Sequence, residues 1–86
     1  MSFEIVYTRR AVRDIEKLPQ DIRSRIGKAM VKLLDDPYPH LIKLISREIG
    51  SYRYRIGEYR AILDIMDQEI VVLRIGHRRD IYRKVK

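Results

Sequence analysis

Three strand-like segments in tandem constrain the fold of this chain more than any other feature. Ser51 to Ile56 and Tyr59 to Met66 flank the pair Gly57-Glu58, and a Gly-X pair suits the two-residue turn of a β-hairpin. Glu69 to Ile75 follows after a polar Asp-Gln connection. Strand-favouring segments separated by such short polar turns predict a three-stranded antiparallel meander.

The first 37 residues are typical of one strand followed by two helices. Phe3 to Tyr7 is rich in strand-favouring residues. Thr8 can cap a helix whose apolar positions are spaced four and three residues apart, at Ala11, Ile15 and Leu18. Asp21 is the expected N-cap of the second helix, which carries an apolar stripe of Ile22, Ile26, Ala29, Met30 and Leu33. Because Pro19 leaves only a tight connection and Pro37 stops the second helix, we expect an antiparallel helical hairpin.

The remaining segments give weaker signals. Tyr38 to Gly50 begins with two prolines and is expected to be irregular, packed on the body by its apolar residues Leu41, Ile42, Leu44 and Ile45. Arg79 to Val85 is compatible with a short helix or an added strand. The sequence therefore predicts an α+β fold in a single domain, residues 1–86. Its two N-terminal helices pack on a twisted, mainly antiparallel four-stranded sheet, and a short C-terminal helix follows.

Composition excludes several classes of protein. The 86 residues include no cysteine and only two histidines, His40 and His77, without a metal-binding motif, so we expect no metal and no other cofactor. No segment reaches the ~20 apolar residues of a membrane helix, and the N-terminus lacks a signal peptide, so we expect a cytoplasmic protein without membrane contact. The formal net charge of +7 favours a nucleic acid or an acidic protein partner.

The hairpin turn determines which charged side chains share a face. With Gly57-Glu58 as the turn, Arg55 lies opposite Arg60, and alternation places Arg53 on the same face. Directly opposed like charges destabilise a sheet by a few tenths of a kcal/mol. One interpretation is a solvated polar face. The other is a phosphate site, because the planar guanidinium fork matches phosphate oxygens.

The third strand ends near the start of the second in such a meander. This return would bring Arg78 and Arg79 close to Arg60, with Tyr82 just beyond. RNA cleavage needs no metal when the 2′-hydroxyl attacks its own adjacent phosphate. Arginines can stabilise the resulting phosphorane, histidine or tyrosine can move protons, and tyrosine can stack on a splayed base.

Two segments, KLISREIGSYRYRIGEYRAILDI and IVVLRIGHRRDIYRKV, resemble the RelE/ParE toxin superfamily, on the RelE side. The resemblance implies a mixed α/β fold and the toxin of a type II toxin–antitoxin pair. RelE-like toxins are metal-independent endoribonucleases that cut mRNA in the ribosomal A site, where 16S rRNA surrounds them. The implied partners are a cognate antitoxin, mRNA and the ribosome.

The resemblance also implies roles for individual residues. Arg53 and Arg55 match the two basic residues of the second-strand motif, where relatives often carry lysine, and Arg60 matches the phosphate-binding arginine. Arg78 or Arg79 matches the arginine that aids the transition state, and the spacing leaves both open. The expected catalytic residues are Arg55, Arg60, Arg78, Arg79 and Tyr82. The expected RNA-binding residues are Arg53, His77 and Arg83.

Two alternatives stay open. ParE-like proteins share the fold but poison DNA gyrase, and they tend to lack the full set of basic residues and the terminal tyrosine. A catalytically inactive member of the fold would bind RNA or the ribosome without cutting. Either toxin class predicts an antitoxin that neutralises the arginine face or displaces the C-terminal segment.

Overall fold

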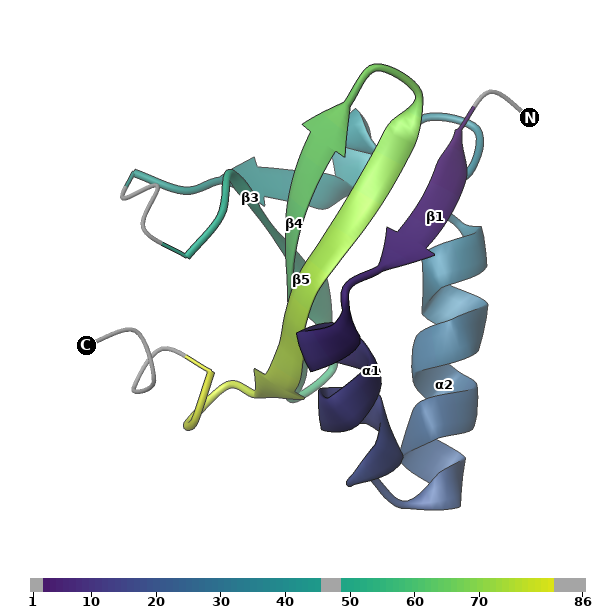
Figure 1. Cartoon of the computed structure of the whole chain (residues 1–86), viewed down its shortest axis with the longest axis vertical. Coiled ribbons are helices and arrows are strands. Elements are labelled where there is room, and N and C mark those ends of the chain that lie inside the picture. The colour runs from purple at the N-terminus through teal and green to yellow at the C-terminus, as the bar shows by residue number, and fades with distance from the viewer. Residues whose placement is uncertain (1–2, 46–48, 82–86) are drawn as a thin grey trace.

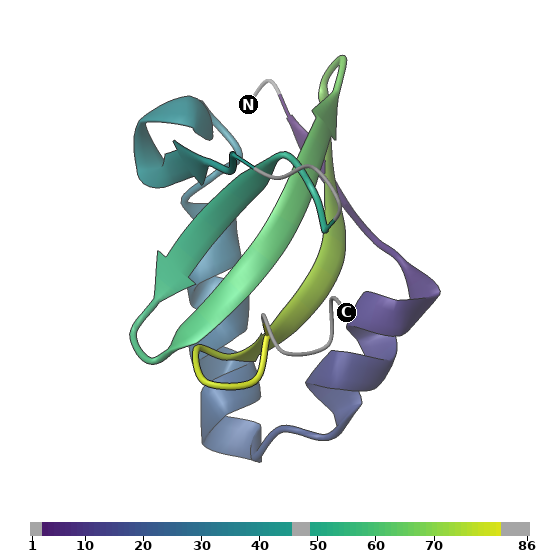
Figure 2. The same cartoon turned by 90° about the vertical axis from the view of Figure 1, so that its left-hand side faces the viewer.

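The computed structural model describes residues 3–45 and 49–81, and it has two helices on one face of a five-stranded sheet (Figures 1 and 2). In chain order the elements are β1 Glu4–Tyr7, α1 Arg9–Glu16, α2 Gln20–Val31, the 3-10 turn Tyr38–His40, β2 Leu41–Lys43, β3 Tyr52–Ile56, β4 Tyr59–Met66 and β5 Glu69–His77. The strand order is β1-β5-β4-β3-β2. Only the pair β1·β5 is parallel.

The predicted meander of β3, β4 and β5 is confirmed, and so is the register of its first hairpin. Arg55 pairs with Arg60, and Ile56 pairs with Tyr59. Gly57 has φ of +60°, as the first central residue of a type II′ turn requires. A two-residue turn therefore fixes the faces of β3 and β4 as the sequence predicted.

The N-terminal helices follow the predicted apolar pattern but differ from the prediction in two details. The Thr8 hydroxyl accepts the Ala11 N–H at 3.1 Å and caps α1. The N-cap of α2 is Pro19 rather than Asp21, which lies in the first helical turn, so the predicted cap was wrong. The helices diverge from their tight connection (Figure 2), and α1 packs on β5 and β1, so the predicted hairpin packing is not observed.

The four-stranded sheet was a wrong prediction, because residues 41–43 form a fifth strand, β2, antiparallel to β3. Three residues are too few to show strand periodicity, and two prolines precede them. The expected burial of this connection was also wrong in part, since Ile42 is 53% exposed and Ile45 is 102% exposed. Tyr38 holds the connection in place, with its ring edge-on to Phe3 and Tyr52.

One continuous core fills the space between the helices and the sheet. It contains residues of both helices, of the turn after α2 and of β3, β4 and β5: Ala11, Ile26, Met30, Leu33, Tyr54, Ile56, Ala61, Leu63, Ile70, Val72 and Ile75. Tyr54 reaches across this core and donates its hydroxyl hydrogen bond to the Ala29 carbonyl at 2.7 Å. Neither α1 nor α2 covers the face of the sheet away from the core, which is termed here the open face (Figure 2).

The chain turns directly after β5. Residues 78–81 form a turn, so the described part of the predicted C-terminal element is neither helix nor strand. The rest of that element lies outside the described residues. Among the residues that the structure describes, no helix is long and apolar enough to cross a membrane.

Candidate nucleic-acid interface

Strand alternation places the predicted arginines on the open face. Arg53, Arg55 and Arg60 alternate with the core residues Tyr54, Ile56 and Ala61 along β3 and β4. Arg55 is exposed and lies directly opposite Arg60, and Arg53 is half-buried opposite Ile62. The predicted arginine cluster is therefore present at the level of the backbone register.

The segment after β5 returns to the β3–β4 turn, as predicted. The Arg78 N–H donates to the Glu58 carbonyl at 2.8 Å, and the Arg78 Nε lies 2.9 Å from Glu58 Oε1. Both side chains are more than half exposed, so solvent screens the ion pair and its contribution to stability is small. Its effect is positional: Arg78 is held beside the turn that joins Arg55 to Arg60.

Arg60 differs from its neighbour because its side chain is buried, at 9% exposure. Its Nη1 donates to the carbonyls of Gly57 at 2.8 Å and Tyr59 at 2.9 Å. These bonds fold the guanidinium onto the backbone of its own hairpin turn. The structure records no carboxylate bound to Arg60 among residues 3–45 and 49–81, so Arg60 gives this end of the sheet a fixed positive potential.

A glycine allows the C-terminal turn to lie close to Arg60. Gly76 pairs with Arg60 across β4 and β5, and a Cβ at this position would lie 3.2 Å from Ile81 Cδ1. Ile81 is 3% exposed, so it packs where a side chain at position 76 would stand. The turn carrying Arg78 and Arg79 is thereby anchored over the open face.

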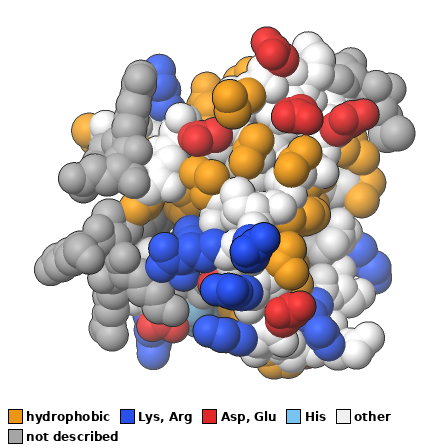
Figure 3. All heavy atoms as spheres, viewed as in Figure 1, with side chains coloured by type: hydrophobic (Ala, Val, Ile, Leu, Met, Phe, Trp, Pro, Cys, Tyr) orange, Lys and Arg blue, Asp and Glu red, His pale blue; other side chains and the backbone are white. Residues whose placement is uncertain are grey.

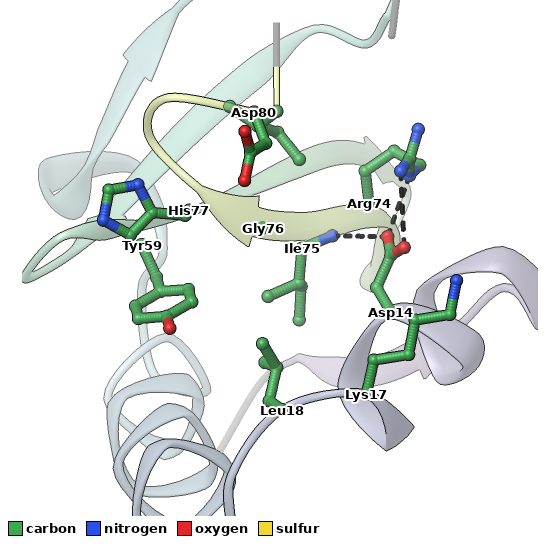
Figure 4. Close-up of a pocket in the computed structure, with 10 residues that line it drawn as sticks. Asp14, Lys17, Leu18, Tyr59, Arg74, Ile75, Gly76, His77 and Asp80 are labelled. Carbon is green, nitrogen blue, oxygen red and sulfur yellow. Dashed lines mark hydrogen bonds and ion pairs between the residues drawn. The ribbon is translucent and has the colours of Figure 1, made fainter. Parts of the chain in front are cut away.

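His77 lies on the other side of the sheet from the arginines. It pairs with Tyr59, and the two rings meet edge-on with centroids 5.4 Å apart. Its Nδ1 accepts a hydrogen bond from the Arg79 N–H at 3.1 Å. The ring therefore stabilises the conformation of the turn that follows β5. His77 also borders an open hollow of about 230 Å³ between the end of α1 and the end of β5 (Figure 4).

Sequence reasoning missed the ion pair at the opposite wall of this hollow. Asp14 Oδ2 accepts from Arg74 Nε at 2.8 Å and from the Ile75 backbone N–H at 3.0 Å (Figure 4). Asp14 Oδ1 accepts from Arg74 Nη2 at 3.3 Å. Because β1 ends at Tyr7, opposite Val72, the carboxylate replaces a strand partner for the last part of β5.

The predicted site is only partly within the described residues. Tyr82 and Arg83 lie outside them, and Arg79 is exposed on the turn. In the ranges 3–45 and 49–81 there is no group of three or more His, Cys, Asp or Glu side chains arranged to hold a metal ion. Among the described residues, three predicted arginines lie together at one end of the open face: Arg55, Arg60 and Arg78.

Comparison with known proteins identifies the family to which this chain belongs. A model of the ParE toxin of type II toxin–antitoxin systems, parDE, matches residues 5–82. Toxin RelG of Mycobacterium tuberculosis is 33% identical over 87 residues, covering 98% of this chain and 100% of RelG. Toxin RelE3 of Methanocaldococcus jannaschii is 26% identical over 83 residues, covering 92% of this chain and 94% of RelE3.

Solved structures agree with this result. A chain of the toxin–antitoxin complex RelBE2 from Mycobacterium tuberculosis superimposes with a TM-score of 0.81 and 28% identity, over 91% of this chain and 100% of that chain. A chain of the archaeal RelE–RelB complex from Pyrococcus horikoshii gives 0.75 and 26%, over 91% and 97%. The chain belongs to the ParE toxin family of type II toxin–antitoxin systems, within the RelE/ParE superfamily.

Proposed function

We propose that this toxin is a ribosome-dependent endoribonuclease that cuts mRNA in the A site and thereby stops translation. The observation that carries the proposal is the convergence of Arg55, Arg60 and Arg78 at one end of the open face. Opposed arginines cost a sheet some stability, and a ligand rich in phosphate compensates for that cost. The curated relatives RelG and RelE3 are named as toxins of the Rel group, which supports the same function.

The geometry supports a division of labour in 2′-hydroxyl attack on the adjacent phosphate. Arg60, fixed by two carbonyls, supplies preorganised positive charge for the phosphorane. Arg55 is exposed and contacts the scissile phosphate directly. A guanidinium group holds its proton tightly and is a poor base, so the role of Arg55 is charge stabilisation. The bond from phosphorus to the 5′-oxygen breaks as the 2′-oxygen bonds to phosphorus. Solvent water takes the 2′-hydroxyl proton and returns a proton to the 5′-oxygen, while Arg78 or Arg79 stabilises the charge that develops on that oxygen.

The remaining predicted residues position the RNA. Tyr82 stacks on or orients the nucleotide next to the cleaved bond, and Arg53 and Arg83 bind the flanking backbone. His77 belongs to this set through its bond to the Arg79 N–H, which shapes the turn. The reaction proposed here runs without a cofactor.

We also propose a cognate antitoxin as the partner of the free toxin. The M. tuberculosis and P. horikoshii relatives were crystallised as RelB–RelE-type complexes. An acidic or amphipathic antitoxin segment on the arginine face would neutralise Arg55 and Arg78 and block RNA at once. The proposal predicts that expression of this chain alone is toxic and that a co-expressed antitoxin restores growth.

A second function, inhibition of DNA gyrase, is favoured by one observation, the match to a family model described for ParE. The two functions make different demands on the arginine face. A gyrase inhibitor tolerates loss of Arg55 and Tyr82, whereas a ribonuclease does not.

The decisive experiment adds the purified protein, freed from any copurified partner, to programmed ribosomes and maps mRNA ends by primer extension. We expect new ends at the A-site codon that require ribosomes. Arg55→Gln and Tyr82→Phe should each reduce cleavage, the first by about 100-fold, because one guanidinium donor to the phosphorane is lost. Arg55 is preferred to Arg60 as a target because Arg60 also braces the turn.

Arg23→Gln is the matched control, because it removes one exposed arginine from α2. It should leave cleavage unchanged. Intact mRNA with the wild-type protein would overturn the proposal. Inhibition of gyrase supercoiling by the same preparation would then establish the second function, and failure in both assays would leave a member of the fold that binds without reacting.

A further inference from the structure

A second group of cations lies on α1, apart from the residues assigned above. Arg9, Arg13 and Lys17 recur at intervals of four residues and Arg10 lies beside them, so one flank of the helix carries four exposed cations. Arg74 of β5 adds a fifth. Figure 3 shows Lys and Arg side chains gathered over this part of the molecule. These five residues are termed the α1 cation stripe.

The stripe borders an open hollow of about 530 Å³ lined by Arg9, Arg10, Arg13, Asp14, Lys17 and Arg74. Every lining side chain is charged. The one carboxylate, Asp14, is engaged by Arg74 at 2.8 Å and by the Ile75 N–H at 3.0 Å. The exposed cations of α1 thus face a hollow whose single acid is already neutralised, which is an arrangement suited to a polyanion.

The composition of the lining distinguishes between two kinds of polyanion. Protein-binding surfaces are centred on apolar or aromatic anchors, and this lining has none. Arg74 directs its fork at Asp14. Three of the other four cations are arginines, whose planar fork matches phosphate oxygens. We propose that the α1 cation stripe binds the phosphate backbone of structured RNA. The choice of RNA rests on the proposed function.

The stripe adjoins the proposed cleavage site without being part of it. Asp14, Lys17 and Arg74 also line the neighbouring hollow, which extends to Gly76 and His77 at the start of the C-terminal turn. The ion pair between Asp14 and Arg74 therefore links the two surfaces (Figure 4). Phosphate contacts orient a protein without reading sequence, so the stripe anchors the toxin on folded RNA while the arginine face engages the strand to be cut.

The test measures binding of a fluorescent RNA duplex of about 16 base pairs, the length that duplex-binding domains span, by anisotropy over a series of salt concentrations. The triple variant Arg9→Gln, Arg13→Gln, Lys17→Gln should weaken binding at least about tenfold and lower the salt slope by about 3. The control triple Arg23→Gln, Lys28→Gln, Lys32→Gln removes the same charge from exposed positions on and just after α2. It should change binding less than about twofold.

A charge-conserving variant gives a second measurement that folding defects do not confuse. Arg9→Lys, Arg10→Lys and Arg13→Lys together keep the charge but remove three forks, so the salt slope should stay while affinity falls several-fold. Equal weakening by the two Gln triples would show a diffuse charge effect and overturn the proposal.

A labelled 20-residue poly-glutamate peptide separates RNA from an acidic protein partner. The peptide could bind the wild-type protein more tightly than the duplex does, and fail to bind the variant Arg9→Gln, Arg13→Gln, Lys17→Gln. The stripe would then bind an acidic protein, and the proposal would be wrong. The duplex is bound without ribosomes and without cleavage. Failure of the proposed ribonuclease function would therefore leave this result unchanged, and the two failures are distinguishable.

Discussion

The two faces of the sheet differ in what holds them together. The helix-covered face presents Tyr54, Ile56 and Leu63 to an apolar core, where the Tyr54 hydroxyl is bonded to a backbone carbonyl. The open face pairs Arg55 with Arg60, a combination that opposes folding. A sheet stabilised on one face can carry unfavourable charges on the other, and under the proposed function a phosphate ligand accounts for the arginines of the open face.

Truncation of a buried side chain on the helix-covered face should have the largest effect on the free energy of unfolding. Leu63 is fully buried opposite Tyr52 and Val72, so Leu63→Ala should lower the free energy of unfolding by about 2–5 kcal/mol through lost burial and a residual cavity. Denaturant unfolding measures it. Met66→Ala, on the open face at 63% exposure, is the matched control. A shift as large as that of Leu63→Ala would contradict the division between the faces.

Two ion pairs of the structure differ in burial. Asp14→Asn leaves Arg74 without its carboxylate where both side chains are about one-eighth exposed, and should cost about 2 kcal/mol of unfolding free energy. Glu58→Gln breaks the exposed pair with Arg78 and should cost less than about 0.5 kcal/mol. Equal losses in chemical denaturation would mean that burial does not decide the strength of these pairs.

Loss of the Tyr54 hydroxyl should lower the free energy of unfolding by a smaller amount, and this loss should depend on pH. Tyr54→Phe removes the hydrogen bond to Ala29 and should cost about 1 kcal/mol at neutral pH. Burial raises the pKa of Tyr54 above its ordinary value of 10.0. The folded state therefore holds this proton more tightly than the unfolded state, and the stabilisation is complete below pH 10 and lost as the pH rises through the raised pKa.

Thermal unfolding between about pH 8 and pH 11 tests this sign. The wild-type protein should lose stability more steeply than Tyr54→Phe above about pH 10. Tyr38→Phe, at a ring that is about half exposed, should follow the wild-type curve. Parallel curves for the wild-type protein and Tyr54→Phe would show that the Tyr54 proton contributes nothing.

The parts of the fold that could be predicted are those in which local chemistry decides the geometry. The Gly57-Glu58 turn fixes the register of β3 and β4, and Thr8 caps α1 through a residue three positions away. The strand β2 was missed because its three residues are defined only by pairing with β3. No local pattern specifies such a pairing.

The candidate site shows the same limit. The arginines of the open face followed from alternation, but the burial of Arg60 against its own turn did not, because sequence does not say where a long side chain folds. The Asp14–Arg74 pair joins residues 60 positions apart. The stripe on α1 was visible in the spacing of Arg9, Arg13 and Lys17 and could have been predicted.

The most direct test of this account measures stability and cleavage on one variant, Arg55→Gln. Loss of a like charge opposite Arg60 should leave the free energy of unfolding unchanged or raise it by a few tenths of a kcal/mol, while A-site mRNA cleavage falls by about 100-fold. A variant that keeps full cleavage, or that loses stability along with activity, would contradict the claim that the open face serves a phosphate ligand at the expense of the fold.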